Sequence, residues 1–373
     1  MLKGLSLREL GKKIADMKNA SKDFIVPTDK LSMQLDEKEG GRIVPVLELF
    51  QTGEARKEIM PLAHDQIGGY LGIPGRYYDQ MLARHPDLLA HNVNTWLRDK
   101  QKEAKTTSQK EAEKRMVRTI DGRARAFLSN KYQRIDNWEI VEVAMPILMG
   151  IPNVQIVSCE ATDRRLYIQA VTPSVTGEIK KGDAVQAGVI ISNSEVGCGS
   201  VSVSSVIWRL ICLNGMKGMD KFRANHVGRA VSDSEELWSD ETRRTDDKLV
   251  LSKVKDMVKA AVDETRFRKS VEKLQELAGV PIPATNIVSA VEVLAPKIGA
   301  GEAEKNGILA AMIEGKDLSA WGLINAVTAQ AHTTKDYDRA VEIEAMGGAM
   351  TNFSARDWKE IVNAEPKALR QAA

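Results

Sequence analysis

The segment of residues 189–218 gathers the side chains that most resemble a reactive site. It holds an Asn-Ser-Glu run at residues 193–195, two of the three cysteines, and Arg209 within an apolar run. Ser194 or Cys198 would be the nucleophile of such a site, and either would need a positioned base. No histidine lies near them in the sequence, and Gly-Cys-Gly-Ser is not the nucleophile elbow of a hydrolase. We therefore favour a structural turn, in which the asparagine and serine bond the backbone and the glycines allow positive φ.

The chain lacks the spacings of the common metal and nucleotide sites. Its five histidines and three cysteines show neither His-Glu-x-x-His nor Cys-x-x-Cys spacing. It contains no phosphate-binding loop of the Gly-x-x-x-x-Gly-Lys type and no dinucleotide fingerprint. We expect no catalytic residue, no metal and no cofactor. The carboxylates at residues 246–247, 336 and 338 keep a metal-dependent nuclease open as an alternative, although such groups more often cap helices or pair with basic side chains.

Basic residues concentrate in the middle of the chain. Residues 98–134 contain 12 Lys/Arg against 5 Asp/Glu, and residues 164–229 contain 9 against 4, whereas the whole chain has a net charge of only +2. This distribution is compatible with a polyanionic partner, and single-stranded nucleic acid binds in cationic grooves. The candidate DNA-binding residues are Arg123, Arg125, Lys131, Arg134, Arg164, Arg165, Lys180, Lys181, Lys217, Lys221 and Arg223.

Aromatic residues are interleaved with this basic set. Tyr132, Tyr167, Trp208 and Phe222 would be stacking platforms in a nucleic-acid groove, but aromatic side chains in such positions are more often core residues. Arg209 has two interpretations as well. It either pairs with a buried acid such as Glu195, which we favour, or faces a groove and contacts phosphate.

The pattern of apolar residues predicts an α+β protein. We expect a central antiparallel β-sheet with packed helices, and helical N- and C-terminal regions. The Asp-Gly pair at residues 121–122 predicts a hairpin. Residues 199–215 fit both a strand and a helix, and their β-branched residues favour a strand at the start, with the later part open. The predicted regions are 1–115, mainly helical; 116–234, the α+β core; and 235–373, helical.

Apolar runs of the chain are too short to cross a bilayer, which needs about 18–20 residues. The first thirty residues also lack the apolar core of a signal peptide. We therefore expect no membrane partner and a cytoplasmic protein.

Four motifs in a fixed order carry a family resemblance. They are LGIPGRYYDQML, RAFLSNKYQRIDN, ISNSEVGCGSVSVSSVIWRLICLNGM and AWGLINAVTAQAH, which together extend from about residue 60 to 345. In this order they resemble the phage- and plasmid-borne proteins of the family called domain of unknown function 932. The resemblance implies a mobile genetic element in a bacterial host cell. It implies no activity and no functional residue, because none is assigned to the family.

A second resemblance is more distant and lies at the level of the fold. The middle of the chain is similar to the β-β-β-α core of phage single-strand annealing proteins of the RecT, Erf and Rad type. That resemblance implies single-stranded DNA in a basic groove and a homo-oligomer, either a ring or a filament. The leading expectation is therefore non-enzymatic single-stranded DNA binding or annealing in recombination or replication. The alternatives are a structural or host-interaction (anti-defence) protein of a mobile element, and a metal-dependent nuclease.

Overall fold

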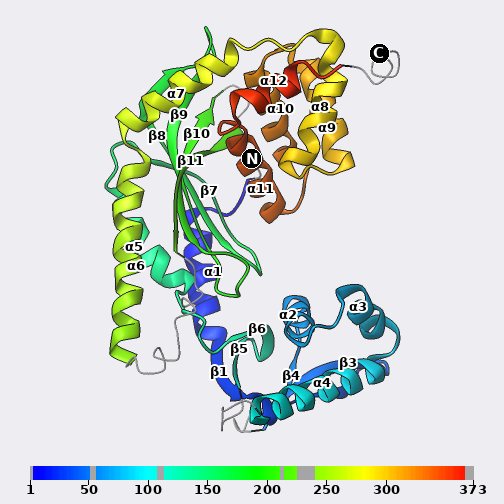
Figure 1. Cartoon of the computed structure of the whole chain (residues 1–373). Coiled ribbons are helices and arrows are strands. Elements are labelled where there is room, and N and C mark those ends of the chain that lie inside the picture. Colours follow the sequence, from blue (N-terminus) through cyan, green and yellow to red (C-terminus); the bar gives the residue numbers. More distant parts are fainter. Residues whose placement is uncertain (1–2, 51–55, 107–112, 211–213, 225–239, 366–373) are drawn as a thin grey trace.

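The structure of the chain is a computed structural model, and it confirms the α+β class. It describes residues 3–50, 56–106, 113–210, 214–224 and 240–365. Figure 1 shows a large antiparallel sheet with helices on both faces and, below it, a smaller part that contains α2, α3 and α4. Helix α1 lies beside the large sheet and leads into β1 of the smaller part (Figure 1).

The smaller part contains two three-stranded antiparallel sheets, with strand orders β2-β3-β4 and β1-β5-β6. Its strands are β1 (Ser21–Pro27), β2 (Leu31–Lys38), β3 (Arg42–Leu49), β4 (Arg56–Glu58), β5 (Lys114–Ile120) and β6 (Arg123–Ser129). The helices of this part of the chain are α1 (Leu7–Ala20), α2 (Pro61–Leu71), α3 (Gly75–Arg84) and α4 (Pro86–Thr106). The first 115 residues thus contain strands as well as the helices that we predicted. Because β5 pairs with β1, one sheet crosses the predicted boundary at residue 115.

The large sheet has five antiparallel strands in the order β11-β10-β9-β8-β7. Its strands are β7 (Gln155–Ala161), β8 (Leu166–Glu178), β9 (Ala184–Asn193), β10 (Val201–Arg209) and β11 (Asn214–Ala224). The ambiguous segment after residue 200 is therefore a strand as far as Arg209. Its consecutive Val206, Ile207 and Trp208 are all buried because both faces of the sheet are covered, and this continuous apolar run also fits a helix.

Helices cover the two faces of the large sheet differently. On one face α1, α5 (Asn137–Met149) and α6 (Asp240–Ala261) enclose a core that includes Val201 and Val203. On the other face Tyr337 and Val341 of α11 pack on Tyr167 of β8. The C-terminal helices are α7 (Glu264–Ala278), α8 (Ile287–Ile298), α9 (Glu302–Gly315), α10 (Ala320–Ala329), α11 (Tyr337–Met350) and α12 (Ala355–Val362). They confirm the helical C-terminal region, and most of them gather around the upper end of the sheet (Figure 1). No described helix is long and apolar enough to span a membrane.

Candidate functional site

Two buried arginines of the β5–β6 hairpin connect the smaller part to the lower end of the large sheet. The hairpin turns at residues 121–122 with φ values of 48° and 75°, as the Asp-Gly pair predicts. Arg118 donates through Nε to Asp23 (2.8 Å), through Nη2 to Asp136 (2.6 Å) and through Nη1 to the carbonyl of Glu195 (2.8 Å). Burial alone would lower the pKa of Arg118, but the carboxylates of Asp136 and Asp23 raise it above its usual value. The guanidinium therefore stays charged while it joins three elements.

Arg125 forms the second buried connection. Its Nη2 donates to Oε2 of Glu195 over 2.6 Å, and Oε1 of Glu195 accepts the backbone N–H of Asn137 over 2.6 Å. Arg125 is 5% exposed and Glu195 is 7% exposed. The Nε of Arg125 is buried and has no hydrogen-bond partner. Each charge of the pair is thus compensated mainly by the other.

The Asn-Ser-Glu run forms the turn that holds this junction. Asn193 donates from Nδ2 to the carbonyl of Ile135 and to Oδ1 of Asn137, both over 2.9 Å. The fully buried Ser194 donates to the carbonyl of Arg164 over 2.7 Å and accepts the N–H of Cys198 over 2.9 Å. These contacts support the structural interpretation of the segment, since the hydroxyl that would be the nucleophile is engaged within the turn.

The two glycines of this turn have different roles. Gly197 adopts a φ of 79°, as we predicted. For Gly199 the prediction of a positive φ was wrong, and a Cβ at this position would lie 3.1 Å from Nε of Arg165. Arg165 donates from Nε and Nη2 to the carbonyl of Cys198, the Nε contact measuring 2.9 Å. This predicted DNA-binding residue thus supports the turn.

A pocket of about 220 Å³ lies beside the junction, where five segments of the chain meet. They are α1, the start of α2, the end of β5, the strand β6 and the β7–β8 turn. The lining residues are Met17, Met60, Pro61, Leu62, Ile120, Arg125, Asp163 and Arg164. Two of the predicted DNA-binding residues, Arg125 and Arg164, therefore share this pocket. Arg123 is exposed and pairs across the hairpin with Ile120, which also lines it.

The remaining basic residues do not join this pocket. Lys131 and Arg134 are exposed in the loop after β6, and Arg134 lies 3.7 Å from Asp23. Lys180 and Lys181 lie in the β8–β9 turn, and the Nζ of Lys180 contacts Asp317 at 2.7 Å. That turn is at the opposite end of the large sheet from Arg164, roughly 30–40 Å away, since β8 has 13 residues at about 3.3 Å each.

The edge strand β11 carries the last three predicted basic residues. Lys217 is half-buried, opposite Val206 of β10. Lys221 and Arg223 belong to β11, but their side chains lie outside the part of the chain that the structure describes. The predicted set is therefore distributed over the two ends and one edge of the sheet.

The aromatic residues near the basic set are mostly core residues. Tyr167 and Trp208 are buried. Tyr132 is half-buried and donates its hydroxyl to the carbonyl of Ser194 over 2.7 Å, and burial raises the pKa of this phenol above its usual value. The side chain of Phe222 lies outside the described residues. Tyr132, Tyr167 and Trp208 thus have structural positions in the fold.

Arg209 pairs with a buried acid, but the acid is Asp183 and the suggested partner Glu195 was wrong. The Nε of Arg209 contacts Oδ1 of Asp183 at 2.5 Å, and Nε1 of Trp321 donates to Oδ2 of the same carboxylate over 2.8 Å. The register explains the difference: Arg209 lies opposite Val185, at the β8–β9 end of the sheet, whereas Glu195 follows the other end of β9.

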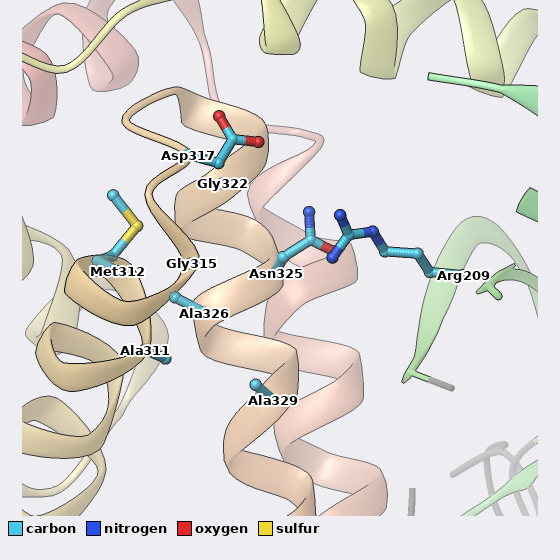
Figure 2. Close-up of a pocket in the computed structure, with 9 residues that line it drawn as sticks. All are labelled: Arg209, Ala311, Met312, Gly315, Asp317, Gly322, Asn325, Ala326 and Ala329. Carbon is cyan, nitrogen blue, oxygen red and sulfur yellow. The ribbon is translucent and has the colours of Figure 1, made fainter. Parts of the chain in front are cut away.

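Figure 2 shows Arg209 reaching from β10 toward α10, with its guanidinium near Asn325. A second pocket of about 120 Å³ lies here, between β10 and the helices α9 and α10. Apart from Arg209, Asp317, Asn325 and Met312, its lining consists of alanine and glycine. Of these small residues, Gly322 is required by its surroundings, since a Cβ there would collide with the carbonyl of Asp317.

Three of the four carboxylates that kept a nuclease open have structural contacts, and the side chain of the fourth, Asp246, lies outside the described residues. Asp336 caps α11 by accepting the N–H of Arg339, and Asp338 accepts the hydroxyl of Tyr167 over 2.8 Å. Asp247 accepts Nε2 of Gln133 over 2.7 Å. Among the described residues, no group of three or more His, Cys, Asp or Glu side chains could hold a metal ion.

Sequence reasoning missed two parts of the junction, Arg118 and the start of α2. The signal for Arg118 was similar to the one that we used for Arg209, namely an arginine between apolar and β-branched residues, here Val117 and Thr119. The contribution of α2 could not be found in this way, because it depends on a long-range contact in which the N–H of Met60 donates to the carbonyl of Ala124 over 2.9 Å.

Comparison with known proteins places the chain in a family. Neither the curated proteins nor the solved structures provide a match. A family model does match, over residues 124–357, and this range contains Arg125 and the helix α11. Since that range is more than half of the chain, the protein belongs to the family described as Domain of unknown function (DUF932).

Proposed function

We propose that the chain is a DNA-binding protein of a phage or plasmid, which binds single-stranded DNA in recombination or replication and catalyses no reaction. The observation that carries the proposal is that Arg125 and Arg164 line the pocket beside the junction, and that the exposed Arg123 lies opposite Ile120 of its lining. These arginines come from the hairpin and from the β7–β8 turn, some 40 residues apart in the sequence. The family resemblance to phage and plasmid proteins supports the biological setting.

The charges at this end of the sheet differ in how available they are to a polyanion. Arg123 and Arg164 are exposed, as is Lys131 in the nearby loop, whereas Arg125 is already paired with Glu195. We therefore expect two or three phosphate contacts for each molecule. Each contact with a single strand contributes about −0.7 to the slope of log K against log salt, so the slope should be about −1.4 to −2.1.

The proposed annealing role requires more than one copy of the chain. The distant resemblance to phage annealing proteins supports a homo-oligomer, a ring or a filament, in the cytoplasm of the bacterial host. In such an assembly each copy would supply a short cationic segment, and the strand would run across successive copies. Light scattering after size-exclusion chromatography measures this directly, and a stable monomer in the presence of oligonucleotide would contradict the annealing role.

Fluorescence anisotropy of a labelled oligothymidylate, measured over a salt series, tests the binding. The variant Arg123→Glu/Arg164→Glu should bind at least tenfold more weakly than the natural chain. Lys181→Glu is the matched control, because Lys181 is also exposed but lies at the opposite end of the large sheet. No binding at low salt would refute the proposed function. An equal loss in Lys181→Glu would show that the junction is not the binding surface.

A further inference from the structure

The pocket beside the junction has the donors of an anion site, and we infer that it binds one phosphodiester group of the DNA backbone. This inference rests on the proposed function for the identity of the ligand. The physical basis of the inference does not depend on the proposed function. Three kinds of donor meet in the pocket: the start of a helix, a buried guanidinium with an unused N–H, and an exposed arginine whose backbone is fixed.

The first donor is the N-terminus of α2. This helix has 11 residues, its N-cap is Met60, and no side chain caps it. Pro61 occupies the first helical position and has no N–H, so the next two N–H groups, of Leu62 and Ala63, are the free donors of the first turn. Met60, Pro61 and Leu62 all line the pocket, and the positive end of the helix dipole favours an anion there.

The second donor is Arg125, which comes from β6. It is more than nine-tenths buried and lines the same pocket, and its Nε is a buried donor without a hydrogen-bond partner. Buried polar atoms of this kind are rare in folded proteins, because each costs free energy unless a partner satisfies it. Glu195 satisfies only Nη2. A phosphate oxygen in the pocket would supply the missing acceptor.

The third donor is Arg164, in the β7–β8 turn. Its side chain is exposed, but its backbone is held from both sides. The carbonyl accepts the hydroxyl of Ser194 over 2.7 Å, and the N–H donates to Oγ1 of Thr162 over 3.1 Å. The Asn-Ser-Glu turn therefore positions this arginine at the pocket, which gives that sequence motif a role in binding as well as in the fold.

The charge around the pocket selects a singly charged ligand. Arg125 and Arg164 are opposed by Glu195, which pairs with Arg125, and by Asp163 on the lining. Only the partial charge of the helix terminus, about half a unit, remains in excess. A phosphodiester carries one negative charge, whereas a terminal phosphate carries close to two at neutral pH. Asp163 would repel the second charge, so an internal backbone phosphate fits this site better than a strand end.

The dinucleotide TpT, which has one phosphodiester and no terminal phosphate, is the probe for this site. Titration of the full chain, followed by the ³¹P resonance of TpT at constant ionic strength, should show saturable binding. Arg164→Gln should weaken it about tenfold, the effect of one lost charge-assisted contact. Arg125→Lys, which keeps the charge but removes Nε, should also weaken it. Lys181→Gln should bind as the natural chain does, and inorganic phosphate should compete poorly.

The titrations with TpT and with oligothymidylate distinguish a failure of the inferred phosphate site from a failure of the proposed function. If oligothymidylate binds but TpT does not, or if Arg164→Gln binds TpT as well as the natural chain does, the pocket is not the phosphate site although the DNA-binding proposal stands. If TpT binds and the oligonucleotide binds no more tightly, the anion site is supported and single-stranded DNA is not its partner. Strong competition by inorganic phosphate would overturn the preference for a diester.

Discussion

Replacing Glu195 by glutamine tests the central contact of the junction. The substitution keeps the size of the side chain and one oxygen, which can still accept the N–H of Asn137. It removes the negative charge 2.6 Å from Nη2 of Arg125 and places an amide N–H₂ there. Arg125 is then left buried as an uncompensated cation, since its side chain is only 6% exposed.

Burial determines the expected magnitude. Removing one partner of a buried ion pair costs about 3–5 kcal/mol, because the remaining charge is neither paired nor hydrated. The pair between Arg268 and Glu264 provides the comparison. It has the same 2.6 Å separation, but its side chains are 69% and 60% exposed. Such helical surface pairs contribute about 0.3–0.5 kcal/mol, so Glu264→Gln should have an effect several times smaller.

Urea unfolding followed by tryptophan fluorescence measures the two effects. Because the chain has several hydrophobic cores, the transitions of secondary structure and fluorescence must coincide before a free energy is derived. The double variant Arg125→Met/Glu195→Gln should regain most of the lost stability, because it no longer buries a lone charge. If Glu195→Gln costs no more than Glu264→Gln, the buried pair does not hold the junction together and the reasoning is wrong.

Three further perturbations test other contacts. Asp183→Asn should lower the free energy of unfolding by about 3 kcal/mol, because Arg209 loses its buried carboxylate. In urea unfolding, the double variant Arg209→Met/Asp183→Asn should lose less stability than Asp183→Asn alone. Gly348→Ala should loosen α11, since a Cβ would collide with a main-chain carbonyl of β11, and faster amide exchange in α11 would report it. Burial raises the pKa of Glu344 from 4.5 to about 7, so the native state keeps a proton that the unfolded state releases. Stability relative to Glu344→Gln should therefore fall as pH rises from about 4.5 to about 7, and a flat difference in urea midpoints would contradict this.

Local features of the sequence were predictable because they depend on neighbouring residues. The Asp-Gly pair at residues 121–122 gives its hairpin by backbone preference alone. The glycine at 197 was assigned to a turn for the same kind of reason. The burial of some residues could also be predicted: the aromatic residues at 167 and 208 lie in the core, as apolar patterns in strands usually require. The strand after residue 200 stayed ambiguous, because coverage of both sheet faces removes the alternation that would have distinguished it from a helix.

The placement of charges could not be predicted, because it depends on strand register and strand length. Arg209 pairs with Asp183 because β9 and β10 are antiparallel, which brings the start of β9 beside the end of β10. The basic set was expected to form one groove, but the length of β8 places Arg164 and Lys180 at opposite ends of the sheet. Charge counted along the sequence therefore overestimated how many of the basic residues share one surface.

Arg125 links the stability of the junction to the proposed anion site, and the two make opposite demands on Glu195. The carboxylate stabilises the fold by compensating the buried guanidinium, but it also reduces the positive potential that a phosphate would meet in the pocket. Glu195→Gln should therefore make the chain less stable and yet bind TpT more tightly, by about tenfold if one charge of repulsion is removed. Binding of TpT should then raise the unfolding temperature of the variant more than that of the natural chain. A variant that loses stability and TpT affinity together would contradict the expected gain in affinity and show that Glu195 acts mainly by shaping the junction.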